Sequence, residues 1–511
     1  LSNAKTAILS GSVSANAINQ GGGGRVIVWS DEYTEFTGNI EAVGGNGFVE
    51  TSSKLNLQAY GVVLAPAGQW LLDPNNIEIV SGSTNTNITG SFQSTDDTAQ
   101  VGVDNIVTAL NAGTSVNIQT QAAGTNAESG NITVSSSIDV SPGATDPTLT
   151  LTASGDITIN DSIESSGDQD LNVVFSAGGN VEINRQIDTK GGDFSSSGGN
   201  FTNNGLGFLL TTGGNINLSH SGAVSINGQV ATGGGSFTSA GTTFANPQSI
   251  DTDGGAFTLN HSGAVTFSST VDASGGAGAI TVNASSTVDI DSSLTSGTGG
   301  FSINDTAGTV SLNGAITTGA GGNLNFGNNP VVLESSKTIE AGGAGAITFG
   351  STFDGDGDSD TLTVTSGTGT VDFTGVLGGS AGLGGLALTS TSGTVTFGST
   401  IDDTGDKGTQ INLDAGSGNV VFSGAIGASN PISSFTIGAA GNVSLQNVGS
   451  AGADVTFDTG DDVAGVDNAL SITNSGTTTF NGTTYLANAQ TYNAATGHSL
   501  AGGSATTFFS T

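Results

Sequence analysis

The chain has 511 residues, of which 43 are acidic and seven are basic, so its formal charge is −36. Nucleic acids and anionic lipid surfaces are bound by clustered Lys and Arg, and this charge balance argues against both as partners. No segment approaches the roughly 20 apolar residues of a membrane span, and without cysteine there is no disulfide framework. The sequence contains no Met and no signal peptide, and we therefore expect a processed or internal piece of a longer product.

Residues 1–80 are the first segment and contain both tryptophans of the chain. A glycine run at residues 21–24 is followed by a buried-strand pattern, RVIVWSD, at residues 25–31. Further short apolar alternations lead to the pattern QWLLDPNNIEIV at residues 69–80. The segment therefore predicts strands around a core that contains bulkier side chains than the rest of the chain.

Two runs in this segment, GGRVIVWSDEYTEFTGNIEAVGGNGFVE and QWLLDPNNIEIV, resemble the large exoproteins of the filamentous-haemagglutinin type. The resemblance implies export by two-partner secretion across the outer membrane of a Gram-negative bacterium, with the outer-membrane transporter as a partner and a secreted or cell-surface location. The secretion domain of that family, with its Asn-Pro-Asn-Gly motifs, is not part of this sequence. The family's glycine-rich insertion before Phe48 is shortened, and beyond residue 80 only the style of the repeat is shared.

Residues 81–130 are polar and irregular, apart from one stretch with apolar residues at helical spacing. Asp104 is a candidate N-cap, and Gly113 is a candidate C′ residue. The stretch predicts one short helix over residues 104–112, packed on the side or edge of the fold at a junction between two repeat segments.

Residues 131–480 carry a repeated phrase: Gly, any residue, Val or Ile, any residue, and an apolar residue. The phrase returns every 22 to 25 residues or so, as from Val371 to Val395 and from Val420 to Val443. The pentapeptide His-Ser-Gly-Ala-Val begins at both His220 and His261, and this longer interval predicts two shorter turns of the same repeat. Glycine supplies the positive φ angles that tight turns between strands require.

The period-two alternation within each turn predicts two or three short strands per 20 to 25 residues. Stacked turn on turn, these strands give a right-handed parallel β-helix, an all-β solenoid with the one helix near residues 104–112. A propeller needs about 40 residues per blade, and leucine-rich repeats need a recurrent leucine and asparagine pattern. We expect the 23 Phe side chains to stack in a narrow interior, some 20 turns of ~4.8 Å each, and residues 481–511 to form terminal turns or a cap.

The densest acidic run offers a candidate metal site. Carboxylates alternate with small residues along a glycine-rich loop, and such oxygen ligands suit Ca²⁺. The run lacks the final bidentate Glu of an EF-hand loop, and its alternative interpretation is a solvated acidic insertion between two turns. The candidate calcium ligands are Asp354, Asp356, Asp358 and Asp360.

The three histidines do not predict a zinc site, because no Cys and no His-x-x-x-His spacing accompanies them. His220 and His261 occupy equivalent repeat positions, and copying through a repeat indicates a structural role in a turn. We therefore expect no enzyme and no certain cofactor, with calcium as the one candidate.

The favoured function is a structural and adhesive rod of a secreted bacterial exoprotein. Its surfaces would attach to polysaccharide or protein of a host surface or matrix through many weak contacts. One alternative is a subunit that assembles end to end into an extracellular filament. The other is a polysaccharide-processing β-helix enzyme, which two positioned carboxylates would require; the scattered basic residues and short loops disfavour it.

Overall fold

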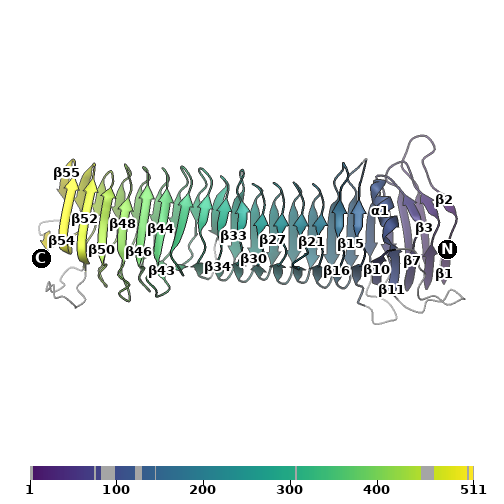
Figure 1. The fold of residues 1–511 in the computed structure, drawn as a ribbon, viewed down its shortest axis with the longest axis horizontal. Helices are drawn as coiled ribbons and strands as arrows, with labels where there is room; N and C mark the ends of the chain where they lie inside the picture. Colours follow the sequence, from purple (N-terminus) through teal and green to yellow (C-terminus); the bar gives the residue numbers. More distant parts are fainter. Residues whose placement is uncertain are drawn as a thin grey trace. The chain divides into compact units, whose positions relative to one another are not determined.

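The computed structural model describes residues 4–73, 76–81, 98–120, 129–143, 145–304, 308–449, 465–502 and 506–509. The chain divides into two compact units, Leu1–Thr252 and Asp253–Thr511. In each unit short strands pair in parallel with the strands one coil before and one coil after, so that three columns of strands surround the core. Figure 1 draws these strands side by side within each unit. The prediction of an all-β parallel solenoid is confirmed.

The first unit contains three columns, in each of which neighbouring strands pair. The first column is β1 (Thr6–Leu9), β4 (Tyr33–Phe36), β7 (Asn56–Ala59), β11 (Thr98–Gly102), β10 (Asn76–Val80), β13 (Ile132–Val134), β16 (Ile157–Ile159), β19 (Val181–Ile183), β22 (Phe201–Asn203), β25 (Val224–Ile226) and β28 (Phe244–Ala245). The second is β3 (Arg25–Ser30), β6 (Phe48–Ser53), β9 (Gln69–Asp73), β12 (Ser115–Gln119), β15 (Thr148–Ala153), β18 (Asn172–Ala177), β21 (Phe194–Gly198), β24 (Ile216–His220) and β27 (Phe237–Gly241). The third contains β2 (Ser12–Ser14), β5 (Asn39–Glu41) and β8 (Val62–Leu64), and then β14 (Ile138–Val140), β17 (Ile163–Ser165), β20 (Ile187–Asp188), β23 (Leu209–Leu210), β26 (Val230–Ala231) and β29 (Ile250–Asp251).

The second unit repeats this arrangement. Its first column is β31 (Val265–Phe267), β34 (Val288–Ile290), β37 (Val310–Leu312), β40 (Val331–Leu333) and β43 (Phe353–Gly355). The second is β30 (Phe257–His261), β33 (Ala279–Ala284), β36 (Gly300–Asn304), β39 (Leu324–Asn325), β42 (Ile347–Phe349), β45 (Val371–Phe373), β47 (Val395–Phe397), β49 (Val420–Phe422), β51 (Val443–Leu445), β53 (Thr477–Phe480) and β55 (Gly497–Leu500). The third is β32 (Val271–Ala273), β35 (Leu294–Ser296), β38 (Ile316–Thr318), β41 (Lys337–Ala341), β44 (Thr361–Ser366), β46 (Gly385–Ser390), β48 (Gln410–Asp414), β50 (Ser434–Ala439), β52 (Val466–Asn474), β54 (Thr484–Ala494) and β56 (Thr507–Phe509).

The repeated phrase of the sequence sets the register within a column. Ile157 pairs with Val181 in the first column, and Val371 pairs with Val395 in the second, so each phrase lies directly on the previous one. Inside the pentapeptide interval, Val224 pairs with Phe244 of the next coil, which confirms that short coils fill it. Alternate side chains of every strand point inward, because successive residues of a strand face opposite sides.

Phenylalanine rings fill part of the core of the second unit, as predicted. Five rings stack face to face through successive coils, with centroids 4.7 to 5.2 Å apart and planes within 16° of parallel. Offset stacking is a favourable geometry for aromatic pairs, and it adds to the burial of the rings. The rings belong to Phe326, Phe349, Phe373, Phe397 and Phe422.

The glycine of the phrase has a different role from the one expected. Gly393 does not have a positive φ, but a Cβ atom on it would lie 1.7 Å from the carbonyl oxygen of Gly369 one coil earlier. The coils approach so closely at this corner that only a residue without a side chain fits. The phrase therefore requires glycine for close approach and not for a left-handed turn.

One helix, α1 (Val103–Asn111), occurs in the described part of the chain, which confirms the predicted helix. Its N-cap is Gly102 and not Asp104, which lies in the first turn, because β11 runs directly into the helix. Gly113 follows with φ 78°, as expected of a C′ glycine. The helix packs against β8 and β14, so it takes the place of a strand in the third column (Figure 1).

Candidate functional site

The acidic run predicted to bind calcium begins within β43 and leads into β44. Asp354 is 7% exposed, and its Oδ1 accepts the backbone N–H of Ser380, in the loop of the next coil, at 2.9 Å. Asp356 Oδ1 accepts the N–H of Asp358 at 2.9 Å, and Asp360 Oδ1 accepts the hydroxyl of Ser336 at 3.0 Å. Asp354 thus lies on the outer side of β43 beneath the loop that it holds, while the other three lie along the turn that follows.

A second aspartate accepts a backbone N–H of the following loop in the same way, two coils later in the second unit. Beyond β43 the first column narrows to single bridging residues, among them Leu377 and Ile401. Asp402, directly after Ile401, accepts the N–H of Ser429 in the following loop at 2.9 Å. The neighbouring Asp403 is 2% exposed and accepts three backbone N–H groups of its own loop, those of Lys407, Gly408 and Thr409. These buried carboxylates replace the strand bonds that the narrowed column lacks.

The described residues contain no group of three or more His, Asp or Glu side chains arranged to hold a metal ion. Asp354 is already engaged with a backbone N–H, so the residues predicted as calcium ligands do not converge on one point. As placed, they do not fit the six to eight oxygens that Ca²⁺ takes. Calcium binding by this run stays a prediction, which titration would test.

Two of the histidines lie inside the solenoid, at the inward-facing end of a strand. His220 ends β24, where its Nε2 lies 3.1 Å from Ser196 Oγ and its ring lies 5.2 Å from that of Phe201. His261 ends β30 in the second unit and is 4% exposed. Burial disfavours the charged imidazolium and lowers the pKa of each histidine to about 4. Both are therefore neutral at pH 7 and belong to the packing, in line with the structural role expected of a repeat copy.

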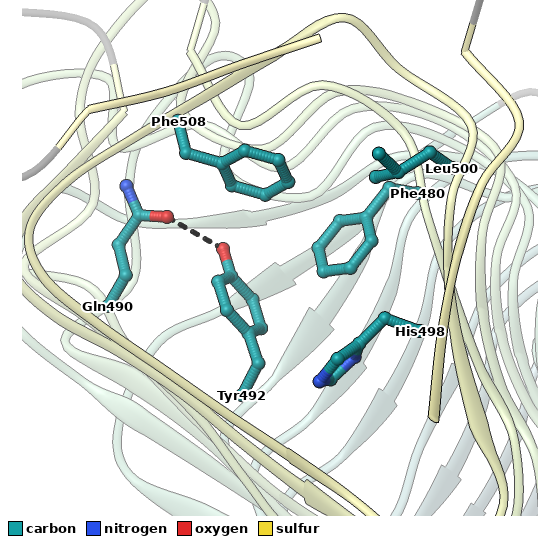
Figure 2. A pocket seen from close by; sticks show the side chains of 6 residues that line it. All are labelled: Phe480, Gln490, Tyr492, His498, Leu500 and Phe508. Carbon is teal, nitrogen blue, oxygen red and sulfur yellow. Dashed lines mark hydrogen bonds between the residues drawn. The ribbon is translucent and has the colours of Figure 1, made fainter. Parts of the chain in front are cut away.

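A cleft of about 490 Å³ lies in the last coils of the second unit, between β53, β54, β55 and β56. Figure 2 shows its lining. The Tyr492 hydroxyl donates to Gln490 Oε1 at 2.9 Å, and burial raises the pKa of this tyrosine well above its usual value. The six lining residues are Phe480, Gln490, Tyr492, His498, Leu500 and Phe508. One imidazole among aromatic rings offers no pair of carboxylates for glycoside hydrolysis.

The outer surface of the first strands carries a feature that the sequence reasoning missed. Arg25 lies over the ring of Phe48, 4.6 Å from its centroid, and Lys54 Nζ lies 5.2 Å from that of Trp29. Lys54 also pairs with Asp31 at 2.6 Å. The period-two alternation of RVIVWS was the available signal, because it puts Arg25, Ile27 and Trp29 on one side of β3.

Asparagine and aspartate side chains form a second missed feature, at a corner between strand columns of the first unit. Asp156 Oδ1 accepts the backbone N–H of Asn180, one coil later, at 2.7 Å. Asn180 Oδ1 accepts the N–H of Asn200 at 2.9 Å, and Asn200 Oδ1 accepts that of Ala223 at 2.9 Å. The signal was present in the phrase itself, whose second position is Asp156 or Asn180 directly after glycine. The corner ladder, Asp156–Asn180–Asn200, supplies acceptors where the strands have ended.

No protein-family model matches the chain, and no curated protein matches it. Among the described residues, no helix has the length and apolar character needed to cross a membrane.

Proposed function

We propose that the chain is a structural and adhesive segment of a secreted bacterial exoprotein, which presents its outer faces for attachment to a cell surface or matrix. The observation that carries the proposal is the parallel pairing of each coil with the next, which is continuous along the second column of each unit. The resemblance of residues 21–80 to filamentous-haemagglutinin-type exoproteins supports the secreted location and the two-partner transporter as export partner. No nucleic acid and no catalytic reaction enters this proposal.

The mechanical part rests on how the coils are joined. Each coil is hydrogen-bonded to the next on up to three sides, while side chains such as the stacked rings of Phe373 and Phe397 continue through the interior. Separating two coils therefore breaks several parallel backbone bonds and exposes apolar surface in one step. Such a segment resists bending, and its repeated outer faces multiply weak contacts into avidity.

Force extension of single molecules tests the mechanical part. We expect the isolated chain to lengthen in repeated small steps, each the release of one coil or a few coils, because each coil contacts only its neighbours. Collapse or rupture as one compact globule contradicts the proposal. Beads coated with the chain test attachment: binding to cell surfaces or extracellular matrix supports the adhesive role, and coated beads that detach as readily as uncoated ones reject it.

A second candidate function is end-to-end assembly into a filament. Several large apolar side chains near the two ends of the described chain are 43 to 62% exposed: Ile8, Ile27, Leu500 and Phe508. An end-to-end contact is heterologous and propagates as an open fibre. Light scattering of the purified chain tests this, with Leu500→Glu expected to abolish assembly and Leu206→Glu, on an equally exposed residue elsewhere, as the matched control. A strictly monomeric wild-type chain rejects this candidate.

A further inference from the structure

The outward face of the second column in the first unit differs in charge from the outward face of the third column. From β12 to β27 the outward-facing side chains form two rows that run from strand to strand in register. The first row is Asn117, Thr150, Val174, Ser195, Asn217 and Thr238. The second row is Gln119, Thr152, Ser176, Ser197, Ser219 and Ala240. Hydroxyls and amides dominate both rows, and no residue in them is charged. We call these twelve residues the uncharged face.

The third-column face of the same coils is acidic, whereas the first-column face carries Glu182 among threonines such as Thr158 and Thr202. Asp139, Glu164 and Asp188 stack outward along the third column. Glu78 and Glu182 lie outward in the first column. The chain has a net charge of −36, so a surface without charge across six coils would favour neutral partners over acidic ones. A neutral polymer can cover this face without desolvating a carboxylate, and the face offers no cation to an acidic polymer.

The same rows continue toward β3 through Leu71, Ile27 and Trp29, with the carboxylates of Glu50 and Asp73 also on this side. Ile27 pairs with Glu50, and Glu50 pairs with Leu71, which lies beside Asn117. In the next row Trp29 pairs with Ser52. Ile27 is 50% exposed, and the indole of Trp29 is partly exposed. The uncharged face is thus continuous with a platform that presents a large ring to the outside.

A polar group inside this platform gives an independent indication of a ligand. Ser52 faces outward between Trp29 and Asp73, yet it is only 1% exposed. Its Oγ has no hydrogen-bond partner among the described residues. A buried hydroxyl without a partner is costly unless something satisfies it. Its place beside the indole suits a ligand that contacts a ring with one surface and hydrogen-bonds with its edge.

From these observations we infer that the uncharged face and the Trp29 platform together bind a neutral polysaccharide chain. A pyranose ring has an apolar C–H surface, which packs on an indole, and hydroxyls around its rim, which bond to Ser, Thr and Asn side chains. Strands spaced ~4.8 Å apart repeat the same donors and acceptors along an extended polymer, so weak contacts add. This inference rests on the proposed adhesive function and names its ligand class.

The test measures binding of the purified 511-residue chain to immobilised glucan, galactan and mannan, with polygalacturonate and heparin as acidic polymers. We expect at least one neutral polymer to bind in preference to both acidic ones. Trp29→Ala should weaken that binding about tenfold, the loss of one ring contact. The double variant Thr150→Asp/Asn217→Asp should weaken it about as much, because it charges the uncharged face.

Thr202→Asp is the matched control. Thr202 faces outward in β22, in the neighbouring column, so the variant adds a like charge without touching the uncharged face. Its affinity should stay within about twofold of wild type, and circular dichroism should show every variant folded. Three results overturn the inference. They are no binding to any neutral polymer, a preference for heparin or polygalacturonate, and equal binding by wild type, Trp29→Ala and the double variant. Bead attachment measured in parallel separates the two proposals: attachment without glycan binding rejects only the ligand, and loss of attachment rejects the adhesive function.

Discussion

At the scale of single residues, the side chains that look most reactive in the sequence hold the coils together. Asp354 and Asp402 hold the loop of the next coil through its backbone N–H groups. His220 and His261 fill the interior as neutral rings. These side chains belong to the packing of the coils, so replacing them acts on stability.

Acidification should therefore destabilise the coil around His220. Burial lowers the pKa of His220 to about 4, against about 6.5 for a free histidine, so between these values only the unfolded chain binds the proton. The stabilisation is complete above about pH 6.5 and is lost as the pH falls toward 4, by up to about 3 kcal/mol. Hydrogen exchange of β24 and β27 amides at pH 7 and pH 5 measures it. His220→Leu should lose this increment of pH dependence; an identical pH response in wild type and variant contradicts the prediction.

Removal of one ring from the phenylalanine stack should lower the free energy of unfolding far more than a substitution on the outward side of the same strand. Phe397 lies between the rings of Phe373 and Phe422, at 5.2 and 4.9 Å. Phe397→Ala should lower the free energy of unfolding of the surrounding coils by about 3–5 kcal/mol, because a cavity replaces the ring. Thr396→Ala, on the outward side of β47, is the control and should change it by less than about 0.5 kcal/mol. Denaturant unfolding measures both, and equal losses would refute the stack as a major source of stability.

At the scale of elements, the corner ladder determines where one strand ends and the next begins. Short strands leave backbone N–H groups at every corner, and side-chain oxygens from the previous coil accept them. The ladder needs an oxygen acceptor on a short side chain, which both Asn and Asp provide. It therefore tolerates Asn and Asp at the same position, as Asp156 and Asn180 illustrate.

Asn180→Ala should remove one rung of this ladder. The amide of Asn200 then loses its acceptor at 2.9 Å, and the local cost should be about 1 kcal/mol. Asn180→Asp keeps an oxygen in place and should restore most of the loss. Exchange of the Asn200 amide proton is the direct measurement. If the Asn200 amide proton exchanges equally fast in the alanine and aspartate variants, the ladder does not stabilise this corner.

The sequence predicted the strands whose pattern repeats. It predicted much less of the side-chain contacts that these strands and their loops make. Val395 and Val420 recur at the period of the coil, so the parallel stack and its register were accessible from spacing alone. The outcome for the acidic run was not, because its spacing does not reveal that the loop of the next coil covers Asp354. The Trp29 platform needed the pairing of β3 with β6, which no local pattern contains. Long-range pairing, not local propensity, decided these cases.

At the scale of the whole molecule, charge and repetition act together. The charge of −36 is spread over both units, and it keeps strand-rich surfaces of separate molecules apart. Acidic columns such as Asp139, Glu164 and Asp188 place this repulsion on particular faces.

Salt should therefore promote lateral association. At about 10 mM ionic strength the Debye length is about 30 Å, and at 1 M it is about 3 Å. We expect light scattering of the purified chain to rise between these conditions, because like charges no longer hold molecules apart. Replacing Asp139 and Glu164 with Asn and Gln should shift the rise to lower salt. Scattering that is independent of salt in both proteins would show that charge does not control association.

The placement of β11 has a consequence for how the first unit forms. In space β11 lies between β7 and β10, although β10 precedes it along the chain. A polypeptide that acquires structure progressively from its amino end can complete the coils up to β9, but β10 has no edge to join until β11 has paired with β7. This inversion divides an otherwise sequential process into two stages, with the pairing of β11 as the step between them.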